Sequence, residues 1–335
     1  MYTPYACGAS LSAKLLRCLP SRGRNEDPIA SSLVVSSSGG MGSWWSLFRA
    51  GNSTTGVFGV FLGAVLALGR LPEGDFALIT ALHALSVMSF MCSWNALNDY
   101  LDLEIDLINR PDRPLPSDTI SKSSAKRAIV LMSMLSVLSI AGAGVIASGL
   151  EEGIEGWYPA LVIWAGALLL LMNYESTSPI SFRLKERGLP GNFAISLSVG
   201  MVVLFGAAGV YQPFHPRAWT VFLVGFLYNL AREIVKDVED IEGDAGRNTY
   251  AMKAGPERAR VVAWLILLIT LASLLTPFAI GIFPELHLVG VMPAVVVLMM
   301  VKPKLFGSED HTAQMLIKRS MQLCLVAMLG SSLMP

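Results

Sequence analysis

Apolar runs separated by short polar stretches fill the chain beyond Trp44. Most runs reach or approach the roughly 20 residues that a helix needs to cross a bilayer. The pattern predicts an all-α membrane protein with nine transmembrane helices packed as one bundle. The predicted spans are residues 54–70, 76–98, 126–149, 157–175, 191–211, 217–233, 259–282, 286–302 and 315–334.

The composition agrees with this pattern and excludes several classes of protein. Of the 335 residues, 53% are hydrophobic and 15% are charged, whereas ordinary soluble domains carry about 25% charged residues. The formal net charge is zero, so bulk charge predicts no nucleic-acid partner. The cysteines lie too far apart in sequence for a metal-binding or disulfide motif; they are Cys7, Cys18, Cys92 and Cys324.

The first 43 residues form an extension that differs from the rest. They are rich in Ser and Gly and contain Lys and Arg, but they have no long apolar run. Three interpretations stay open: a disordered tail, an artefact upstream of a true start at Met41, or an organelle transit peptide. We therefore divide the chain into an extension over 1–43 and a membrane domain over 44–335.

Lys and Arg are distributed asymmetrically between the predicted loops. If the N-terminus is cytoplasmic, the inner segments hold 23 of the 25 basic residues, and the outer loops hold only Arg70 and Arg217. Positive residues favour the cytoplasmic side, so the sequence predicts a multi-pass cell-membrane protein with a cytoplasmic N-terminus. The unusual polar residues also fall at span ends on this inner side, which we expect to carry the active site.

An acidic stretch follows the second predicted span. Its polar positions are Asn98, Asp99, Asp102, Glu104 and Asp106. If the helix continues, Asn98, Asp102 and Asp106 lie on one face, one turn apart. Carboxylates so placed repel each other unless a cation lies between them, and Mg²⁺ prefers carboxylate and phosphate oxygens. The stretch therefore predicts a metal–phosphate site at the end of a membrane helix.

A proline-rich loop, residues 110–116, follows and contains Arg110 and Arg113. Their guanidinium groups could clamp phosphate oxygens, although the positive-inside rule alone would also place arginines there. Asn52, at the start of the first span, is equally ambiguous: it could contact substrate or cap the helix.

A second acidic stretch follows the sixth predicted span. Asp237, Asp240 and Asp244 share one helical face, with Lys236 beside them. Two such faces at one membrane side, with interposed cations, suit the binding of a diphosphate through Mg²⁺. A cation-coupled transporter is the rival interpretation, but transporter sites tend to lie near the bilayer midplane.

The two stretches also resemble a known family. NDYLDLEID followed by NRPDRPLPS resembles the first aspartate-rich motif of the UbiA superfamily of intramembrane prenyltransferases, and KDVEDIEGD resembles the second. The similarity extends from RAGN at 49–52 over nearly everything beyond residue 45. It implies a nine-helix bundle around a central cavity, Mg²⁺ dependence, and transfer of an isoprenoid from its diphosphate.

Within the family, NRPDRPLPSDTIS, RLKERGLPGN and REIVKDVEDIEGD are most similar to the archaeal digeranylgeranylglyceryl phosphate synthases. This resemblance implies transfer of a geranylgeranyl group from geranylgeranyl diphosphate to the hydroxyl of geranylgeranylglyceryl phosphate, a lipid-like acceptor. An aromatic acceptor of the quinone or chlorophyll type is the alternative. Asn98, Asp99, Asp102 and Asp106 match the family's first motif, and Asp237, Asp240 and Asp244 match the second. The candidate catalytic residues are Asp102, Asp106, Asp240 and Asp244, which with Asp237 are also the candidate metal ligands. The candidate substrate-binding residues are Asn52, Asn98, Asp99, Arg110, Arg113, Lys236 and Asp237.

Overall fold

The computed structural model of the chain describes residues 40–175, 181–241 and 248–334. Most of the predicted extension, residues 1–39, lies outside this part, and the first helix begins at Met41. Within the described residues the structure is helical throughout, without strands. The all-α fold predicted from the apolar pattern is confirmed.

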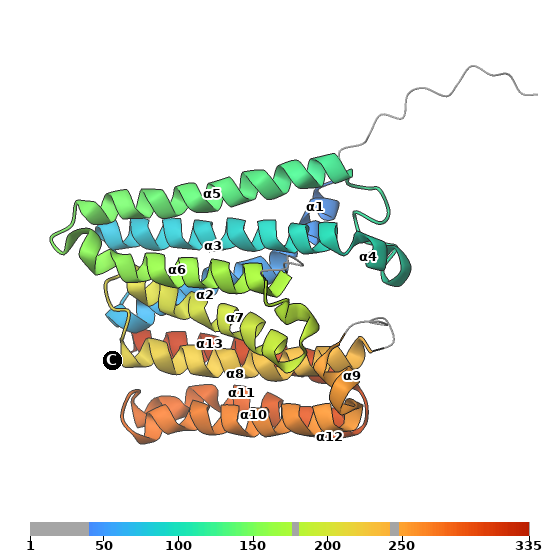
Figure 1. Cartoon of the computed structure of the whole chain (residues 1–335). Coiled ribbons are helices and arrows are strands. Elements are labelled where there is room, and N and C mark those ends of the chain that lie inside the picture. The colour runs from blue at the N-terminus through green and yellow to red at the C-terminus, as the bar shows by residue number, and fades with distance from the viewer. Residues whose placement is uncertain (1–39, 176–180, 242–247, 335) are drawn as a thin grey trace, which may run out of the picture. The chain divides into compact units, whose positions relative to one another are not determined.

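The α-helices follow one another with short connections (Figure 1). Their bounds are α1 Met41–Leu47, α2 Ala50–Leu68, α3 Gly74–Leu101, α4 Leu103–Asn109, α5 Lys122–Ser148, α6 Gly153–Glu175, α7 Leu189–Gly209, α8 Pro216–Glu239, α9 Tyr250–Ala254, α10 Pro256–Ala279, α11 Leu288–Met299, α12 Val301–Phe306 and α13 Asp310–Leu333. Two 3₁₀ turns, η1 Leu184–Glu186 and η2 Glu285–His287, complete the order.

Eight helical segments of the described chain are long and apolar enough to cross a membrane. They are α2, α3, α5, α6, α7, α8, α10 and the broken helix over residues 285–306. The ninth predicted span, 315–334, corresponds to α13, which is 24 residues long but is not among the eight. The multi-pass membrane fold is therefore confirmed, and the count of nine spans stays a prediction.

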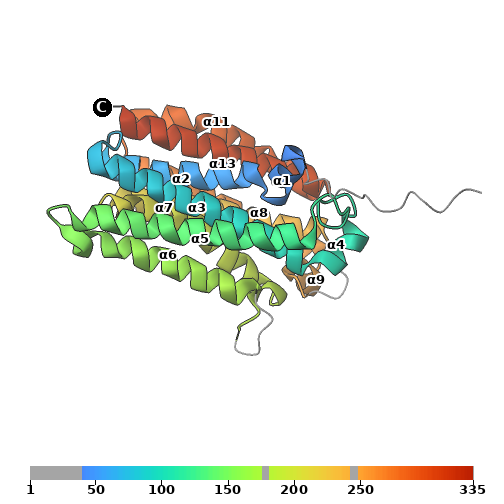
Figure 2. The same ribbon diagram turned by 90° about the horizontal axis from the view of Figure 1, so that it is seen from above.

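The largest cluster of buried hydrophobic residues in the described chain lies where α8 packs between α7, α10 and α13. Tyr228 of α8 is fully buried there, and its hydroxyl lies 2.8 Å from the hydroxyl of Ser320 on α13. A buried phenol needs such a partner, because an unpaired hydroxyl in an apolar interior costs free energy. This bond helps to hold α13 against α8. Figure 2 shows the same helices from above, with α13 beside α2 and α11.

The contact between α2 and α7 depends on glycine. A Cβ added to Gly63 would overlap the carbonyl oxygen of Val203, and one added to Gly206 would overlap the carbonyl oxygen of Val60. The two backbones therefore approach each other directly, as small residues allow in membrane helices. This close approach sets the position of α2 next to the middle of the bundle.

Gly63→Ala is expected to destabilise the bundle by about 1–3 kcal/mol, because the added methyl group forces α2 and α7 apart. Gly225→Ala is the matched control, since a Cβ at this position within α8 meets no atom within 4 Å. Thermal unfolding of the detergent-solubilised variants measures the difference. Equal unfolding midpoints for both variants would show that the close α2–α7 contact does not contribute measurably to the stability of the bundle.

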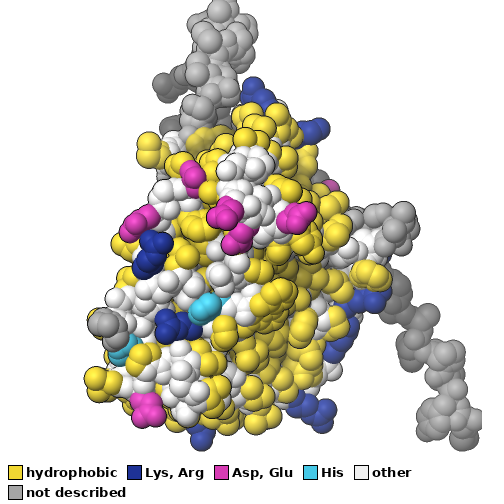
Figure 3. Space-filling model, turned by 90° about the vertical axis from the view of Figure 1, so that its left-hand side faces the viewer, with side chains coloured by type: hydrophobic (Ala, Val, Ile, Leu, Met, Phe, Trp, Pro, Cys, Tyr) yellow, Lys and Arg dark blue, Asp and Glu magenta, His cyan; other side chains and the backbone are white. Residues whose placement is uncertain are grey.

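The two ends of the bundle differ in character. The C-terminal ends of α3 and α8 lie at the same end as α4 and α9, on the right in Figure 1. Figure 3 views the opposite end, where some acidic side chains gather and hydrophobic side chains cover much of the surface. Both acidic stretches therefore lie at one end of a largely apolar bundle.

Candidate active site

The first acidic stretch is bent rather than straight. Residues up to Leu101 belong to α3, and α4 begins at Leu103, with Asp102 between them at φ −86° and ψ 10°. The expectation of one continuous helix is therefore wrong at this residue. Backbone bonds nevertheless continue through the bend, because the amide of Asp102 donates to Asn98 and that of Asp106 donates to Asp102, each at 2.9 Å.

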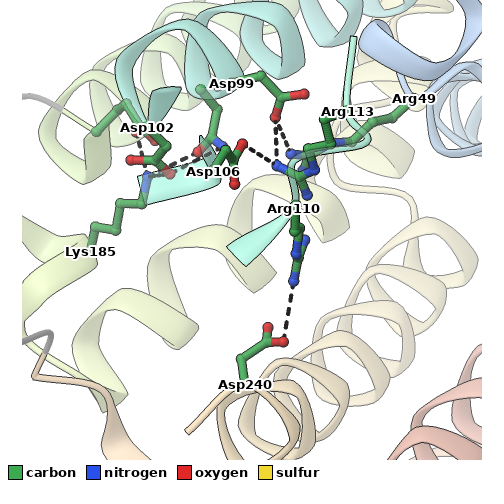
Figure 4. Close-up of polar contacts among 10 residues, drawn as sticks. Arg49, Asp99, Asp102, Asp106, Arg110, Arg113, Lys185 and Asp240 are labelled. Carbon is green, nitrogen blue, oxygen red and sulfur yellow. Dashed lines mark hydrogen bonds and ion pairs between the residues drawn. The ribbon is translucent and has the colours of Figure 1, made fainter. Parts of the chain in front are cut away.

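Asp99 lies between two arginines (Figure 4). Its Oδ1 accepts from Arg49 Nη2 at 2.5 Å and from Arg113 Nη1 at 3.2 Å, and its side chain is only 4% exposed. The same Nη1 of Arg113 donates to Asp106 Oδ2 at 2.6 Å. Burial of two carboxylates is tolerated here because charged guanidinium groups compensate them. Arg113 thus ties α3, α4 and the loop after α4 together.

Asp102 faces a lysine that comes from the connection between α6 and α7. Lys185, in η1, donates to Asp102 Oδ2 at 2.9 Å, to Asn98 Oδ1 at 3.0 Å and to Glu175 Oε1 at 2.6 Å. An ammonium group has three donors, and all three are used here. Lys185 therefore gathers the first acidic stretch and the end of α6 around one positive charge.

The second acidic stretch lies at the end of α8, and its two described aspartates, Asp237 and Asp240, have different partners. Asp237 Oδ2 accepts from Asn192 Nδ2 of α7 at 2.9 Å and from the Tyr250 amide at 3.3 Å. Asp240 follows α8 as its C-cap and accepts from Arg110 Nη2 at 3.2 Å. The remaining predicted ligand, Asp244, lies outside the described residues.

The ion pair between Arg110 and Asp240 joins the two stretches, which are 130 residues apart in sequence. Figure 4 shows Asp240 below the row formed by Asp99, Asp102 and Asp106, with Arg110 between them. The expected convergence of the two stretches is therefore present in the structure. Arg110 connects them by a direct contact, which spacing alone could not indicate.

A cavity of about 110 Å³ lies at this junction. Its lining combines cations, carboxylates and amide groups; the residues are Tyr174, Lys185, Gly188, Asn192, Glu233, Lys236, Asp237, Asp240 and Thr249. Lys236 is held at its edge by Glu233, with Nζ 2.9 Å from Oε2. The second acidic stretch borders this space directly through Asp237 and Asp240. The first is linked to it by Lys185, which lines the cavity and also contacts Asp102.

Two predicted site residues have other surroundings. Asn52, at the start of α2, accepts from Lys318 Nζ of α13 at 3.2 Å and, within the described part of the chain, does not hydrogen-bond to the aspartates. Asp99 is enclosed by arginines, so its described contacts are with guanidinium groups and not with the cavity. In the described part of the chain, no three acidic, His or Cys side chains form a group suited to a metal ion.

The sequence patterns assign no specific role to Arg49, Glu175 or Asn192, and for Lys185 they leave open contact with an anionic acceptor or the positive-inside rule alone. Each comes from a different helix end or loop. Arg49, Lys185 and Asn192 each contact an aspartate only in the folded chain, and Glu175 contacts Lys185. One signal was available in the sequence: Glu175 and Asn192 lie at the ends of predicted spans and Arg49 and Lys185 in the adjoining segments, all on the predicted inner side that also carries the acidic stretches. For these residues, the position in the predicted membrane topology was therefore a better indicator of the site than any local sequence motif.

Comparison with known proteins agrees with this geometry. The model of the UbiA prenyltransferase family matches residues 56–323. Digeranylgeranylglyceryl phosphate synthase of Methanopyrus kandleri is 34% identical over 298 residues, which cover 88% of this chain and 100% of that protein. The enzyme of the same name from Thermococcus kodakarensis is 34% identical over 285 residues, covering 83% and 93%.

Solved membrane structures share the fold. A structure described for digeranylgeranylglyceryl phosphate synthase superposes with a TM-score of 0.64 at 24% identity, covering 88% of this chain and 98% of that one. A UbiA homologue from Archaeoglobus fulgidus bound to GPP and Mg²⁺ gives 0.57 at 17% identity, covering 85% and 99%. With the family match over most of its length, the chain belongs to the UbiA prenyltransferase family.

Proposed function

We propose that this prenyltransferase is a digeranylgeranylglyceryl phosphate synthase. It would transfer a geranylgeranyl group from geranylgeranyl diphosphate to the hydroxyl of geranylgeranylglyceryl phosphate. The observation that carries the proposal is the Arg110–Asp240 contact, which joins the loop after the first acidic stretch to the second stretch, beside a cavity lined by Lys185 and Lys236. The names of the relatives, at 34% identity over most of the chain, support this acceptor.

The carboxylates of the cavity fit Mg²⁺ in one particular way. Mg²⁺ in proteins is usually held by one or two carboxylates together with substrate phosphates. Asp240, which lines the cavity, and Asp102, which is linked to it by Lys185, suit this role because their side chains are 37% and 18% exposed. Asp106, Asp237 and Asp244 complete the proposed set. Bound Mg²⁺ would neutralise charge on the leaving diphosphate.

Basic side chains of the chain itself would bind the same diphosphate. Lys185 and Lys236 line the cavity, and Arg110 reaches Asp240 at its edge. Their positive charges would favour the form of the donor in which the diphosphate carries the electrons of the broken C1–O bond. The acceptor oxygen then forms a bond to C1 and its proton passes to a basic oxygen at the site. The ether linkage results.

The apolar interior of the bundle would hold the isoprenoid chain. Because the basic residues concentrate at the inner ends of the predicted spans, we propose that the N-terminus and the active site lie on the cytoplasmic side. Water-soluble diphosphate then leaves on the side at which the cavity opens, while the lipid product stays in the membrane.

A transfer assay with purified protein tests the proposal. Labelled geranylgeranyl diphosphate and Mg²⁺ are combined with either geranylgeranylglyceryl phosphate or 4-hydroxybenzoate, and an EDTA sample serves as the control. We expect Mg²⁺-dependent product with the glycerol phosphate acceptor. Product with the aromatic acid alone would replace the proposed acceptor by one of the quinone type, and no product with either would reject both.

A further inference from the structure

A second group of cations lies beside the proposed donor site, where α2, α8 and α13 pack together. Lys318 of α13 donates to Asn52 Oδ1 of α2 at 3.2 Å. Among the described residues Lys318 has no carboxylate partner, and it lies within electrostatic range of Arg232 on α8. Three helices that are distant in sequence therefore bring two positive charges together.

The charges of this group are incompletely balanced. Arg232 Nη1 lies 3.3 Å from Glu233 Oε1, but Nε of the same guanidinium is buried and has no hydrogen-bond partner among the described residues. Glu233 is also shared with Lys236, which lies 2.9 Å from it. One carboxylate thus faces several cations. A buried donor without a partner is costly, so the arrangement fits an anion that is not part of the chain.

The position of the group relates it to the donor site. Arg232 and Lys236 are four residues apart on α8, so they lie on the same face, separated by one turn of about 5.4 Å. Lys236 lines the proposed diphosphate cavity. An anion bound by Arg232 and Lys318 would therefore lie about one helical turn from the donor diphosphate.

We propose that Arg232 and Lys318 bind the phosphate of the lipid acceptor. This inference rests on the proposed function and adds to it the recognition of the acceptor head group. A guanidinium can donate two parallel hydrogen bonds to phosphate, and an ammonium supplies a further charge. Asn52 holds Lys318 in place through its side-chain oxygen. The glycerol of such an acceptor, only a few bonds from its phosphate, would then reach the donor.

This assignment separates two anions that carry similar chemistry. The donor diphosphate meets Lys185, Lys236 and Arg110, which contact residues of the acidic stretches or line their cavity. The acceptor phosphate meets the group on α8 and α13. Distinct sets of cations would stop one substrate from occupying the place of the other.

Kinetics of Lys318→Gln test the assignment, with Arg319→Gln as the matched control. Arg319 is the neighbouring cation on α13, and its side chain is exposed, whereas that of Lys318 is half-buried. We expect Lys318→Gln to raise KM for geranylgeranylglyceryl phosphate about tenfold or more. KM for geranylgeranyl diphosphate should stay within twofold, Lys318→Arg should restore most of the loss, and Arg319→Gln should behave as wild type.

Binding of the acceptor in the absence of the donor separates this inference from the proposed function. Geranylgeranylglyceryl phosphate is titrated into wild type and Lys318→Gln, and thermal protection is measured. Weaker binding in the variant supports the phosphate site even if no transfer occurs. A phosphate site on α8 and α13 is ruled out if both proteins bind equally, or if the KM that rises is that of the donor.

Discussion

Asp102→Asn and Asp240→Asn are each expected to lower kcat for prenyl transfer by about 10²–10³-fold or more, the scale of losing one group that stabilises developing charge. Each carboxylate lies near the junction of the two acidic stretches, and each is paired with a cation, Lys185 for Asp102 and Arg110 for Asp240. Asparagine keeps the size of the side chain but removes its charge, so the fold should remain. Initial rates at saturating donor and acceptor measure the loss.

Glu104→Gln is the control for this experiment. Glu104 belongs to the same acidic stretch, in the first turn of α4, but its side chain is exposed. Removing its charge should leave kcat within about twofold, which is a small effect on the barrier. Rates close to wild type in both aspartate variants would reject the assignment of Asp102 and Asp240.

Arg113→Ala is expected to destabilise the protein by about 3 kcal/mol, the scale of breaking a buried ion pair by removing one partner. The guanidinium of Arg113 joins Asp99 and Asp106, whose side chains are 4% and 8% exposed. Without it, Asp99 keeps its ion pair with Arg49, whereas Asp106 loses the one ion pair that it forms among the described residues. Transfer activity should fall as well, because Asp106 then loses its position.

The thermal unfolding midpoint measures this effect, and we expect a decrease of several degrees. Arg127→Ala is the control, because Arg127 is exposed on α5 and donates only to Ser124. A variant at Arg113 that unfolds at the wild-type temperature, with full activity, would show that the arginine merely follows the positive-inside rule. That was the open alternative in the sequence.

Much of the fold follows from the apolar pattern, since each predicted span coincides with a helix of the structure. The ninth span, which corresponds to α13, is less apolar than the other eight. Polar residues such as Gln314, Lys318 and Ser320 on α13 reduce its apolar character. Lys318 and Ser320 contact other helices, so the lower hydropathy of α13 reflects partners inside the bundle. Hydropathy alone cannot distinguish such a helix from a surface helix.

The location of the site was predictable from the sequence, but which cation contacts which aspartate was not. The periodicity of both acidic stretches and their common side of the membrane indicated that they converge. That Asp99 would be enclosed by Arg49 and Arg113, and that Lys185 would meet Asp102, depends on residues 14 to 83 positions apart. Such pairs are decided by helix packing, which local spacing does not encode. Asp244, outside the described residues, stays a prediction.

Binding of geranylgeranyl diphosphate tests most directly whether the two acidic stretches form one site. The dissociation constant is measured with Mg²⁺ and with EDTA for wild type, Asp102→Asn, Asp240→Asn and the double variant. We expect Mg²⁺-dependent binding by wild type, at least tenfold weaker binding by each single variant, and a double variant much less impaired than the product of the single effects. Independent, multiplying effects, or donor binding that is unchanged by EDTA and by all three variants, would contradict a shared metal–diphosphate site.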